Sequence, residues 1–166
     1  MNLPPPAPPA ATVVLLHGFA GAGFMVKPLG YALRRAGYRP VELGYDSWGL
    51  PLERICDRLL PRLAQLDEES EAPLHIVAHS MGGLVARALL HRQRPRTLGH
   101  VVMLGTPNGG SEIADFLDRH SLLRPILGRA APALVTNRSA MIDALLGPID
   151  YPVGVIAGDR PILPGP

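Results

Sequence analysis

The sequence predicts an α/β fold in which helices flank a mostly parallel β-sheet. Short apolar runs rich in β-branched residues alternate along the chain with longer segments of helical period. Most of these runs are apolar on both faces, as the buried strands of a parallel sheet are. The chain has 166 residues, which fits a single domain.

Five apolar runs are the expected strands. Successive parallel strands need a crossover segment between them, and such crossovers are almost always right-handed. The segments between the runs should therefore pack as helices on the faces of the sheet. The expected strands are Thr12–Leu16, Pro40–Leu43, Leu74–Ala78, Val101–Leu104 and Val153–Ala157.

Three helices are expected between the first four strands. The first has Pro28 in its first turn and Gly37 at its end, as helix termini prefer. The second carries an apolar stripe from Leu52 to Leu66, and Pro61 is expected to kink or split it. The third follows the Leu74–Ala78 run directly, with its apolar positions at Leu84, Val85, Ala88 and Leu89.

Two segments lie outside this alternation. The first is a proline-rich arm at residues 1–11, which precedes the domain at residues 12–166. The second lies within the domain. Between Gly109 and Pro152 no strand is evident, and a cap-like helical excursion over one end of the sheet is expected. Its helical patterns are Ile113–Leu117, Leu122–Leu127 and Ala140–Leu146.

Charge and composition exclude several classes of protein. The net charge of +2 is too small for nucleic-acid binding, and no run approaches the roughly 18 apolar residues of a membrane span. The prolines near the N-terminus occupy the place of an export signal, so a cytoplasmic location is expected. The single cysteine, Cys56, rules out an internal disulfide and is expected in the core.

The segment from Leu74 to Leu89, LHIVAHSMGGLVARAL, holds the main candidate for chemistry. A strand runs into His79-Ser80-Met81-Gly82-Gly83, and a helix begins at once. In such a strand–turn–helix elbow the central side chain is lifted off the sheet, and glycines let strand and helix approach closely. The Ser80 hydroxyl would then lie at a helix N-terminus, where the Met81 amide favours a developing negative charge.

Two further loops follow strands and should meet Ser80 at the carboxyl edge of the sheet, where α/β proteins bind ligands. One contains His17-Gly18-Phe19, and the other contains Thr106 and Pro107. The Phe19 amide could give a second donor to an oxyanion. The segment Asp46–Trp48 either lines the pocket mouth or forms a polar turn. The expected pocket-lining residues are His17, Gly18, His79, Thr106 and Pro107.

These motifs resemble α/β-hydrolases of the lipase and esterase kind, and are similar to bacterial triacylglycerol lipases and to the lipase-like family of inositol-deacylase proteins. The resemblance implies a Ser80 nucleophile, oxyanion donors at Phe19 and Met81, and a carboxylic ester substrate, small-molecule or lipid, with no metal or organic cofactor. Ala78 replaces the first glycine of the family's elbow. The matching segments are HGFAG at 17–21, AHSMGGLVAR at 78–87 and LGTPNGGSEIADF at 104–116.

The sequence departs from this family after the last expected strand. Such hydrolases order their triad as Ser, then Asp or Glu, then His. Only GDRPILPGP follows residue 157, so Asp159 is the acid available, and no histidine comes after it. The sequence therefore resembles a hydrolase that lacks its last strand and its base. Asp159 itself is either the acid or a turn residue.

None of the histidines is an evident general base. His120, in the helical excursion, is the one that could swing toward Ser80. Without a base the hydroxyl stays a neutral alcohol, and losing triad members costs about 10⁴ to 10⁶ in turnover. A catalytically inactive hydrolase-like module is thus the alternative to an active enzyme. A nucleotide-binding domain is disfavoured, because Gly18, Gly21 and Gly23 have the spacing G-x-x-G-x-G and not G-x-G-x-x-G.

Overall fold

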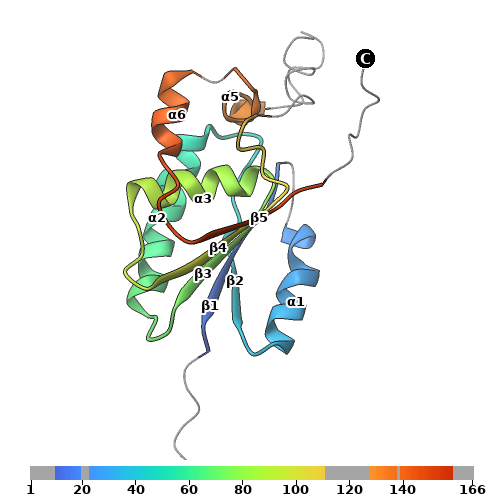
Figure 1. The fold of residues 1–166 in the computed structure, drawn as a ribbon, viewed down its shortest axis with the longest axis vertical. Coiled ribbons are helices and arrows are strands. Elements are labelled where there is room, and N and C mark those ends of the chain that lie inside the picture. The colour runs from blue at the N-terminus through green and yellow to red at the C-terminus, as the bar shows by residue number, and fades with distance from the viewer. Residues whose placement is uncertain (1–9, 20–22, 111–127, 138, 159–166) are drawn as a thin grey trace, which may run out of the picture.

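A five-stranded, wholly parallel sheet forms the centre of the computed structural model, with strand order β2-β1-β3-β4-β5 (Figure 1). The structure describes residues 10–19, 23–110, 128–137 and 139–158. The predicted fold class, a parallel sheet flanked by helices, is confirmed. The strands are β1 (Thr12–Leu16), β2 (Arg39–Glu42), β3 (Leu74–His79), β4 (Leu98–Leu104) and β5 (Val153–Ile156).

The described helices follow the expected order between the strands. None of them is long and apolar enough to cross a bilayer. They are the 3₁₀ turn η1 (Gly23–Met25) and the helices α1 (Lys27–Arg35), α2 (Leu52–Glu68), α3 (Met81–Arg92), α5 (Ala131–Leu134) and α6 (Ala140–Leu146).

Alternate side chains of the strands divide between the two faces of the sheet. In β1, Val14 and Leu16 join the large core formed with α2, α3 and α6, whereas Val13 and Leu15 pack beneath α1. All four are almost completely buried, as expected for a central parallel strand. Cys56 of α2 is a free thiol within the large core, as its helical spacing predicted. Burial raises its pKa to about 11.

Pro61 was expected to kink or split its helix; α2 continues through Pro61 from Leu52 to Glu68, so the proline does not split it. Pro61 is exposed, so its ring faces solvent and removes one backbone hydrogen bond on the outer side. Buried residues on both sides of it, among them Ile55, Leu59, Leu63 and Leu66, pack against one core. This packing keeps the residues on both sides of Pro61 helical.

The β5 strand lies at the edge of the sheet, which corrects the expectation that its apolar run is buried. Val155 is 55% exposed and Ile156 is 63% exposed. Nothing in the described part of the chain covers these two side chains. The bounds of the other strands differ little from those expected, except that β4 begins at Leu98 and not at Val101. The added residues pair with the start of β3, where the register of the two strands shifts between Leu74 and Ile76.

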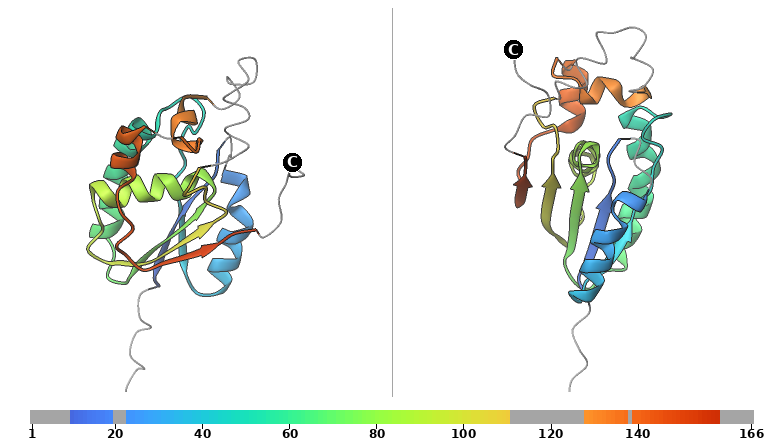
Figure 2. Two further views of the ribbon diagram at one scale, coloured as in Figure 1. Left: turned by 45° about the horizontal axis from the view of Figure 1, so that its top comes forward. Right: turned by 90° about the vertical axis from the view of Figure 1, so that its right-hand side faces the viewer.

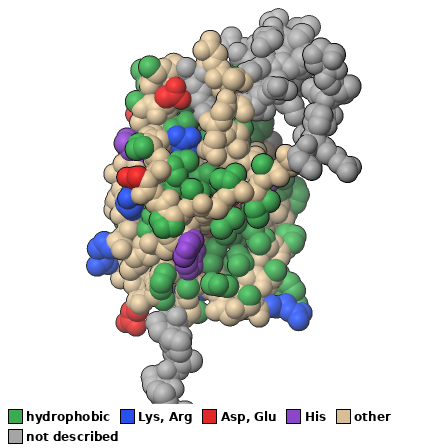
Figure 3. Space-filling model, viewed as in Figure 1, with side chains coloured by type: hydrophobic (Ala, Val, Ile, Leu, Met, Phe, Trp, Pro, Cys, Tyr) green, Lys and Arg blue, Asp and Glu red, His purple; other side chains and the backbone are tan. Residues whose placement is uncertain are grey.

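The sheet face that carries α1 is covered only in part, since α1 packs along β2 and over β1. Figure 3 shows hydrophobic side chains gathered on this face between β5 and α1. A hollow of about 280 Å³ opens here, at the start of the strands and away from the carboxyl edge. Its lining residues are Val13, Leu33, Tyr38, His75, Ile76, Val77, His100 and Val102.

The helical excursion is described in part. The α6 helix matches the pattern predicted at Ala140–Leu146, and the short helix α5 was not anticipated. The α5 helix lies at the carboxyl end of the sheet, and α6 packs against α3, with Gly147 at its end beside His91 (Figures 1 and 2). The patterns predicted at 113–117 and 122–127 fall outside the described residues, as does most of the N-terminal arm.

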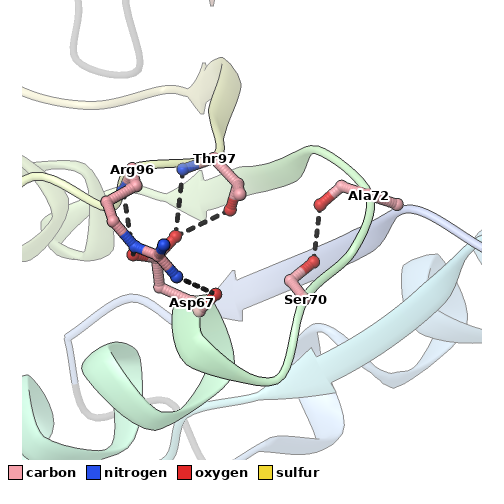
Figure 4. Close-up of polar contacts among 5 residues, drawn as sticks. All are labelled: Asp67, Ser70, Ala72, Arg96 and Thr97. Atoms are coloured by element: carbon pink, nitrogen blue, oxygen red, sulfur yellow. Dashed lines mark hydrogen bonds and ion pairs between the residues drawn. The ribbon is translucent and has the colours of Figure 1, made fainter.

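A buried carboxylate ties the end of α2 to the start of β4. Asp67 accepts hydrogen bonds from the amides of Arg96 (2.9 Å) and Thr97 (3.0 Å) and from the Thr97 hydroxyl (2.7 Å), as Figure 4 shows. Its ion pair with the exposed Arg96 guanidinium is longer, 3.4 Å. Burial raises the pKa of Asp67, but the hydrogen bonds from Thr97 and Arg96 outweigh it, and the net pKa lies below the ordinary value.

We therefore predict that Asp67→Asn lowers the free energy of unfolding at pH 7 by about 2 kcal/mol, because the amide keeps only one acceptor oxygen and turns an NH2 group toward the donors that the other oxygen served. The folded pKa is depressed, so the carboxylate contributes its full stability above the unfolded pKa of about 3.9 and loses it as the pH falls through the folded value. Urea titrations from pH 7 to pH 3 should show the difference between wild type and variant narrowing below about pH 4.

Asp150→Asn is the control, because it removes an exposed partner of Arg94 and should change stability little. A difference between wild type and Asp67→Asn that is independent of pH would contradict the role given to the Asp67 charge.

Candidate active site

Ser80 occupies a strained backbone conformation between β3 and α3. Its φ of 52° and ψ of −123° make it the one non-glycine residue with positive φ in the described segments. Such a conformation costs about 1 to 3 kcal/mol and persists only where surrounding structure enforces it. The Ser80 amide donates to the Leu104 carbonyl (2.8 Å), and the Ser80 carbonyl accepts from the Gly83 amide (3.0 Å).

The first turn of α3 can approach the sheet because Gly82 and Gly83 have no side chains. A Cβ on Gly82 would lie 2.6 Å from the carbonyl oxygens of Leu16 and His17. A Cβ on Gly83 would lie 2.0 Å from Oγ1 of Thr106. The elbow is thus wedged between the end of β1 and the loop after β4, as the sequence predicted from its glycines.

Gly18 brings the loop after β1 against the elbow. A Cβ built on Gly18 would lie 3.1 Å from Cβ of Ser80 and 3.0 Å from Nδ1 of His79. The following residue, Phe19, is partly buried and packs against the large core. Met81 is fully buried, and as the first residue of α3 it has an amide that no helical carbonyl can accept.

His17 lies beneath this loop and is only 2% exposed. Its Nε2 accepts from the Tyr45 amide at 3.4 Å, and its Nδ1 lies 2.8 Å from the Gly18 carbonyl oxygen. This pattern places the ring proton on Nδ1, where it is donated to Gly18. The ring also stacks on Tyr45, with centroids 4.2 Å apart and planes 10° apart. Both ring nitrogens of His17 are therefore hydrogen-bonded, Nδ1 within its own loop and Nε2 to the loop after β2.

The loop after β4 is tied to α3 and α6. Gly105 begins it with a φ of 57°, and Thr106 packs on the first turn of α3. The Arg87 guanidinium of α3 donates to Oδ1 of Asn108 (3.3 Å) and to the Gly147 carbonyl at the end of α6 (2.7 Å). Oγ1 of Thr106 is buried and has no hydrogen-bond partner within the described structure.

The loop after β2 contains the polar turn that the sequence allowed. Oδ1 of Asp46 accepts from the amides of Trp48 (3.1 Å) and Gly49 (2.7 Å), and these hydrogen bonds hold its pKa below the ordinary value. Trp48 is 56% exposed, and its carbonyl accepts from the Arg129 amide at 2.8 Å. This loop therefore contacts the helical excursion. Tyr45, just before the turn, was not singled out from the sequence.

His79 directly precedes Ser80, and its ring lies near Gly18. The remaining histidines lie away from Ser80 or outside the described structure. His75 and His100 are at the start of β3 and β4, where the His100 amide donates to Nδ1 of His75 (2.9 Å). Burial and the neighbouring His100 lower the pKa of His75. The His91 ring packs against Gly147. Both His120 and the candidate acid Asp159 fall outside the described residues.

Among the residues that the structure places, no histidine forms an ion pair with an acid. Within the same residues, no group of three or more His, Cys, Asp or Glu side chains is arranged to hold a metal ion. The described site thus consists of the Ser80 elbow and the loops after β1, β2 and β4.

Solved structures of α/β-hydrolases share this fold. The mature lipase BlEst2 of Bacillus licheniformis is 22% identical with a TM-score of 0.66, over 79% of this chain and 57% of its own. Phospholipase PlaB of Legionella pneumophila is 18% identical with a TM-score of 0.59, over 82% of this chain and 35% of its own. An extracellular alpha/beta-hydrolase from a Paenibacillus species is 21% identical with a TM-score of 0.51, over 63% of this chain and 45% of its own.

These likenesses establish the α/β-hydrolase fold, and this chain spans 57% or less of the length of each of the three. No curated protein matches the sequence significantly. One family model matches residues 49–154, which include β3, the Ser80 elbow and β4. Because that match extends over more than half of the chain, the protein belongs to the family described as Domain of unknown function (DUF7379).

Proposed function

We propose that the protein is a serine hydrolase that cleaves carboxylic esters through an acyl-enzyme on Ser80. The observation that carries this proposal is the strained conformation of Ser80 at the N-terminus of α3. Elbows of this kind expose a nucleophilic hydroxyl above the sheet. Strain held at one non-glycine residue is also typical of functional sites. The lipase, phospholipase and hydrolase neighbours support the same class of reaction.

The reaction has two halves. The Ser80 oxygen attacks the ester carbonyl carbon while a base takes the hydroxyl proton, and the carbonyl oxygen becomes an oxyanion. When this tetrahedral species collapses, the bond to the alcohol oxygen breaks, and the proton goes to the departing alkoxide. Water then attacks the acyl-enzyme in the same way, releasing the acid and restoring the Ser80 hydroxyl.

The backbone amides of Met81 and Phe19 are the proposed oxyanion donors. The Met81 amide is one of the free amides at the start of α3, where the helix dipole also favours negative charge. The Phe19 amide follows Gly18, whose backbone lies directly against Ser80. His17, Gly18, His79, Thr106 and Pro107 are the proposed surroundings of the bound ester.

The mechanism also needs a general base and an acid that orients it, and the residues named so far provide neither. Asp159 is proposed as the acid. A hydrolase-like module without turnover is the alternative function. It is favoured by the absence of a histidine–acid pair within the described residues.

We predict that the purified chain hydrolyses p-nitrophenyl acetate or butyrate and that Ser80→Ala abolishes this turnover. The alanine removes the nucleophile, and in complete triads such losses reach about 10⁴ to 10⁶ in kcat. The measurement is p-nitrophenol release under steady-state conditions. Intact mass after treatment with a fluorophosphonate checks whether the Ser80 oxygen displaces fluoride and becomes phosphonylated.

Ser70→Ala is the matched control, because the Ser70 hydroxyl donates to the Ala72 carbonyl in the α2–β3 loop, away from the elbow. Equal turnover by wild type and Ser80→Ala would exclude the proposed nucleophile and favour the inactive module.

We further predict that added imidazole raises the Ser80-dependent rate, because a free base can take the hydroxyl proton where no positioned histidine does so. Rates of ester hydrolysis are measured for wild type and Ser80→Ala at the same imidazole concentrations. The rate with the variant measures hydrolysis by imidazole in solution, and it is subtracted from the wild-type rate. The difference should rise with imidazole concentration.

The opposite outcome would be turnover that imidazole leaves unchanged, that follows an apparent pKa near 6.5 to 7, and that His120→Ala removes. That result would assign the base to His120 within this chain.

A further inference from the structure

The structure assigns to Tyr45 the role of a positioning residue that fixes the His17–Phe19 loop beside Ser80. This inference rests on the proposed function, because the loop is taken to present the Phe19 amide to an oxyanion. Tyr45 belongs to the loop after β2, and no catalytic motif of the sequence includes it. Its contacts carry the argument.

The pairing of β1 with β2 brings Tyr45 next to His17. The Leu43 amide donates to the Leu15 carbonyl at 3.0 Å, so the two strands remain paired up to the loops that follow them. Tyr45 packs against the large core, and its ring lies flat on the His17 ring. The two side chains are thus held face to face at the carboxyl edge of the sheet.

The Tyr45 hydroxyl donates a hydrogen bond to the His17 carbonyl oxygen. Burial raises the pKa of Tyr45 above its ordinary value, with a smaller contribution from Cys56, so the hydroxyl keeps the proton that it donates. The same carbonyl oxygen faces the first turn of α3, because a Cβ on Gly82 would lie 2.6 Å from it. Without the hydroxyl, a buried acceptor would lose its donor.

This hydrogen bond fixes one peptide plane of the loop. A trans peptide group is planar, so holding the His17 carbonyl also sets the direction of the Gly18 amide. Gly18 has free rotation about its own dihedral angles, and a second constraint is needed before the next peptide group is fixed. That constraint also passes through Tyr45.

The Tyr45 amide donates to Nε2 of His17, which leaves the ring proton on Nδ1. Nδ1 in turn donates to the Gly18 carbonyl at 2.8 Å. The Gly18 carbonyl and the Phe19 amide belong to the same peptide group and point in opposite directions. Tyr45 therefore constrains both peptide groups that flank Gly18, and through them the direction of the Phe19 N–H.

The test is Tyr45→Phe, which keeps the stacked ring and removes only the hydroxyl. Tyr38→Phe is the matched control, because Tyr38 is 41% exposed and lines the hollow near the start of the strands. We expect Tyr45→Phe to lower kcat for p-nitrophenyl butyrate about 10- to 100-fold relative to Tyr38→Phe. This is less than the roughly 10²- to 10³-fold cost of deleting an oxyanion donor. KM should stay within about two-fold, because the loss falls on the transition state.

A second measurement does not depend on turnover. In ¹H–¹⁵N spectra, Tyr45→Phe should shift the amide resonances of Gly18 and Phe19 and leave those of α1 unchanged, whereas Tyr38→Phe should leave Gly18 and Phe19 unshifted. Thermal melts of both variants check that the comparison is made between folded proteins.

The outcomes separate the two proposals. If wild type turns over esters and Tyr45→Phe behaves like Tyr38→Phe, or if kcat falls only as far as the folded fraction does, the role of Tyr45 is overturned. If wild type shows no Ser80-dependent turnover, the proposed hydrolase function fails by itself. The amide resonances of Gly18 and Phe19 in Tyr45→Phe then test the positioning role of Tyr45 alone. A shift supports that role, and unchanged resonances refute it.

Discussion

The close approach of α3 to the sheet is the constraint on which the rest of the site depends. Gly82 and Gly83 let the first turn of the helix touch the end of β1 and the loop after β4, where a methyl group would meet carbonyl oxygens or a hydroxyl. This contact, with the hydrogen bond from Ser80 to Leu104, holds Ser80 in a conformation that an isolated serine would not keep. The loops after β1 and β4 therefore pack against the turn that carries Ser80.

The two faces of the sheet differ in how completely the described residues cover them. On one face, α2, α3 and α6 cover a large core, and Asp67 fastens α2 to the start of β4. On the other face, Ile156 at the end of β5 stays exposed, and Val102 of β4 is only partly buried. The chain spans 57% of the Bacillus licheniformis lipase that shares its fold.

The proposed chemistry needs two kinds of group, which differ in how much of the fold is required to place them. A nucleophile and two oxyanion donors need only local structure: a strand, a tight turn, a helix N-terminus and a neighbouring loop. A general base needs a side chain delivered from elsewhere in the fold, together with an acid that orients it. The described residues include the proposed nucleophile and the proposed oxyanion donors, and hydrogen bonds of Arg87 and Tyr45 hold the loops after β4 and β1.

The sequence by itself determined the alternation of strands and helices and located the glycine-containing turn at Ser80, because periodicity and turn chemistry act over a few residues. Only the tertiary structure decided which strand lies at an edge, since the exposure of Val155 and Ile156 depends on what packs beside β5. It also decided that α2 continues past Pro61, because core contacts on both sides outweigh one missing hydrogen bond. The link from Tyr45 to His17 joins residues 28 positions apart, and no local pattern encodes such a contact.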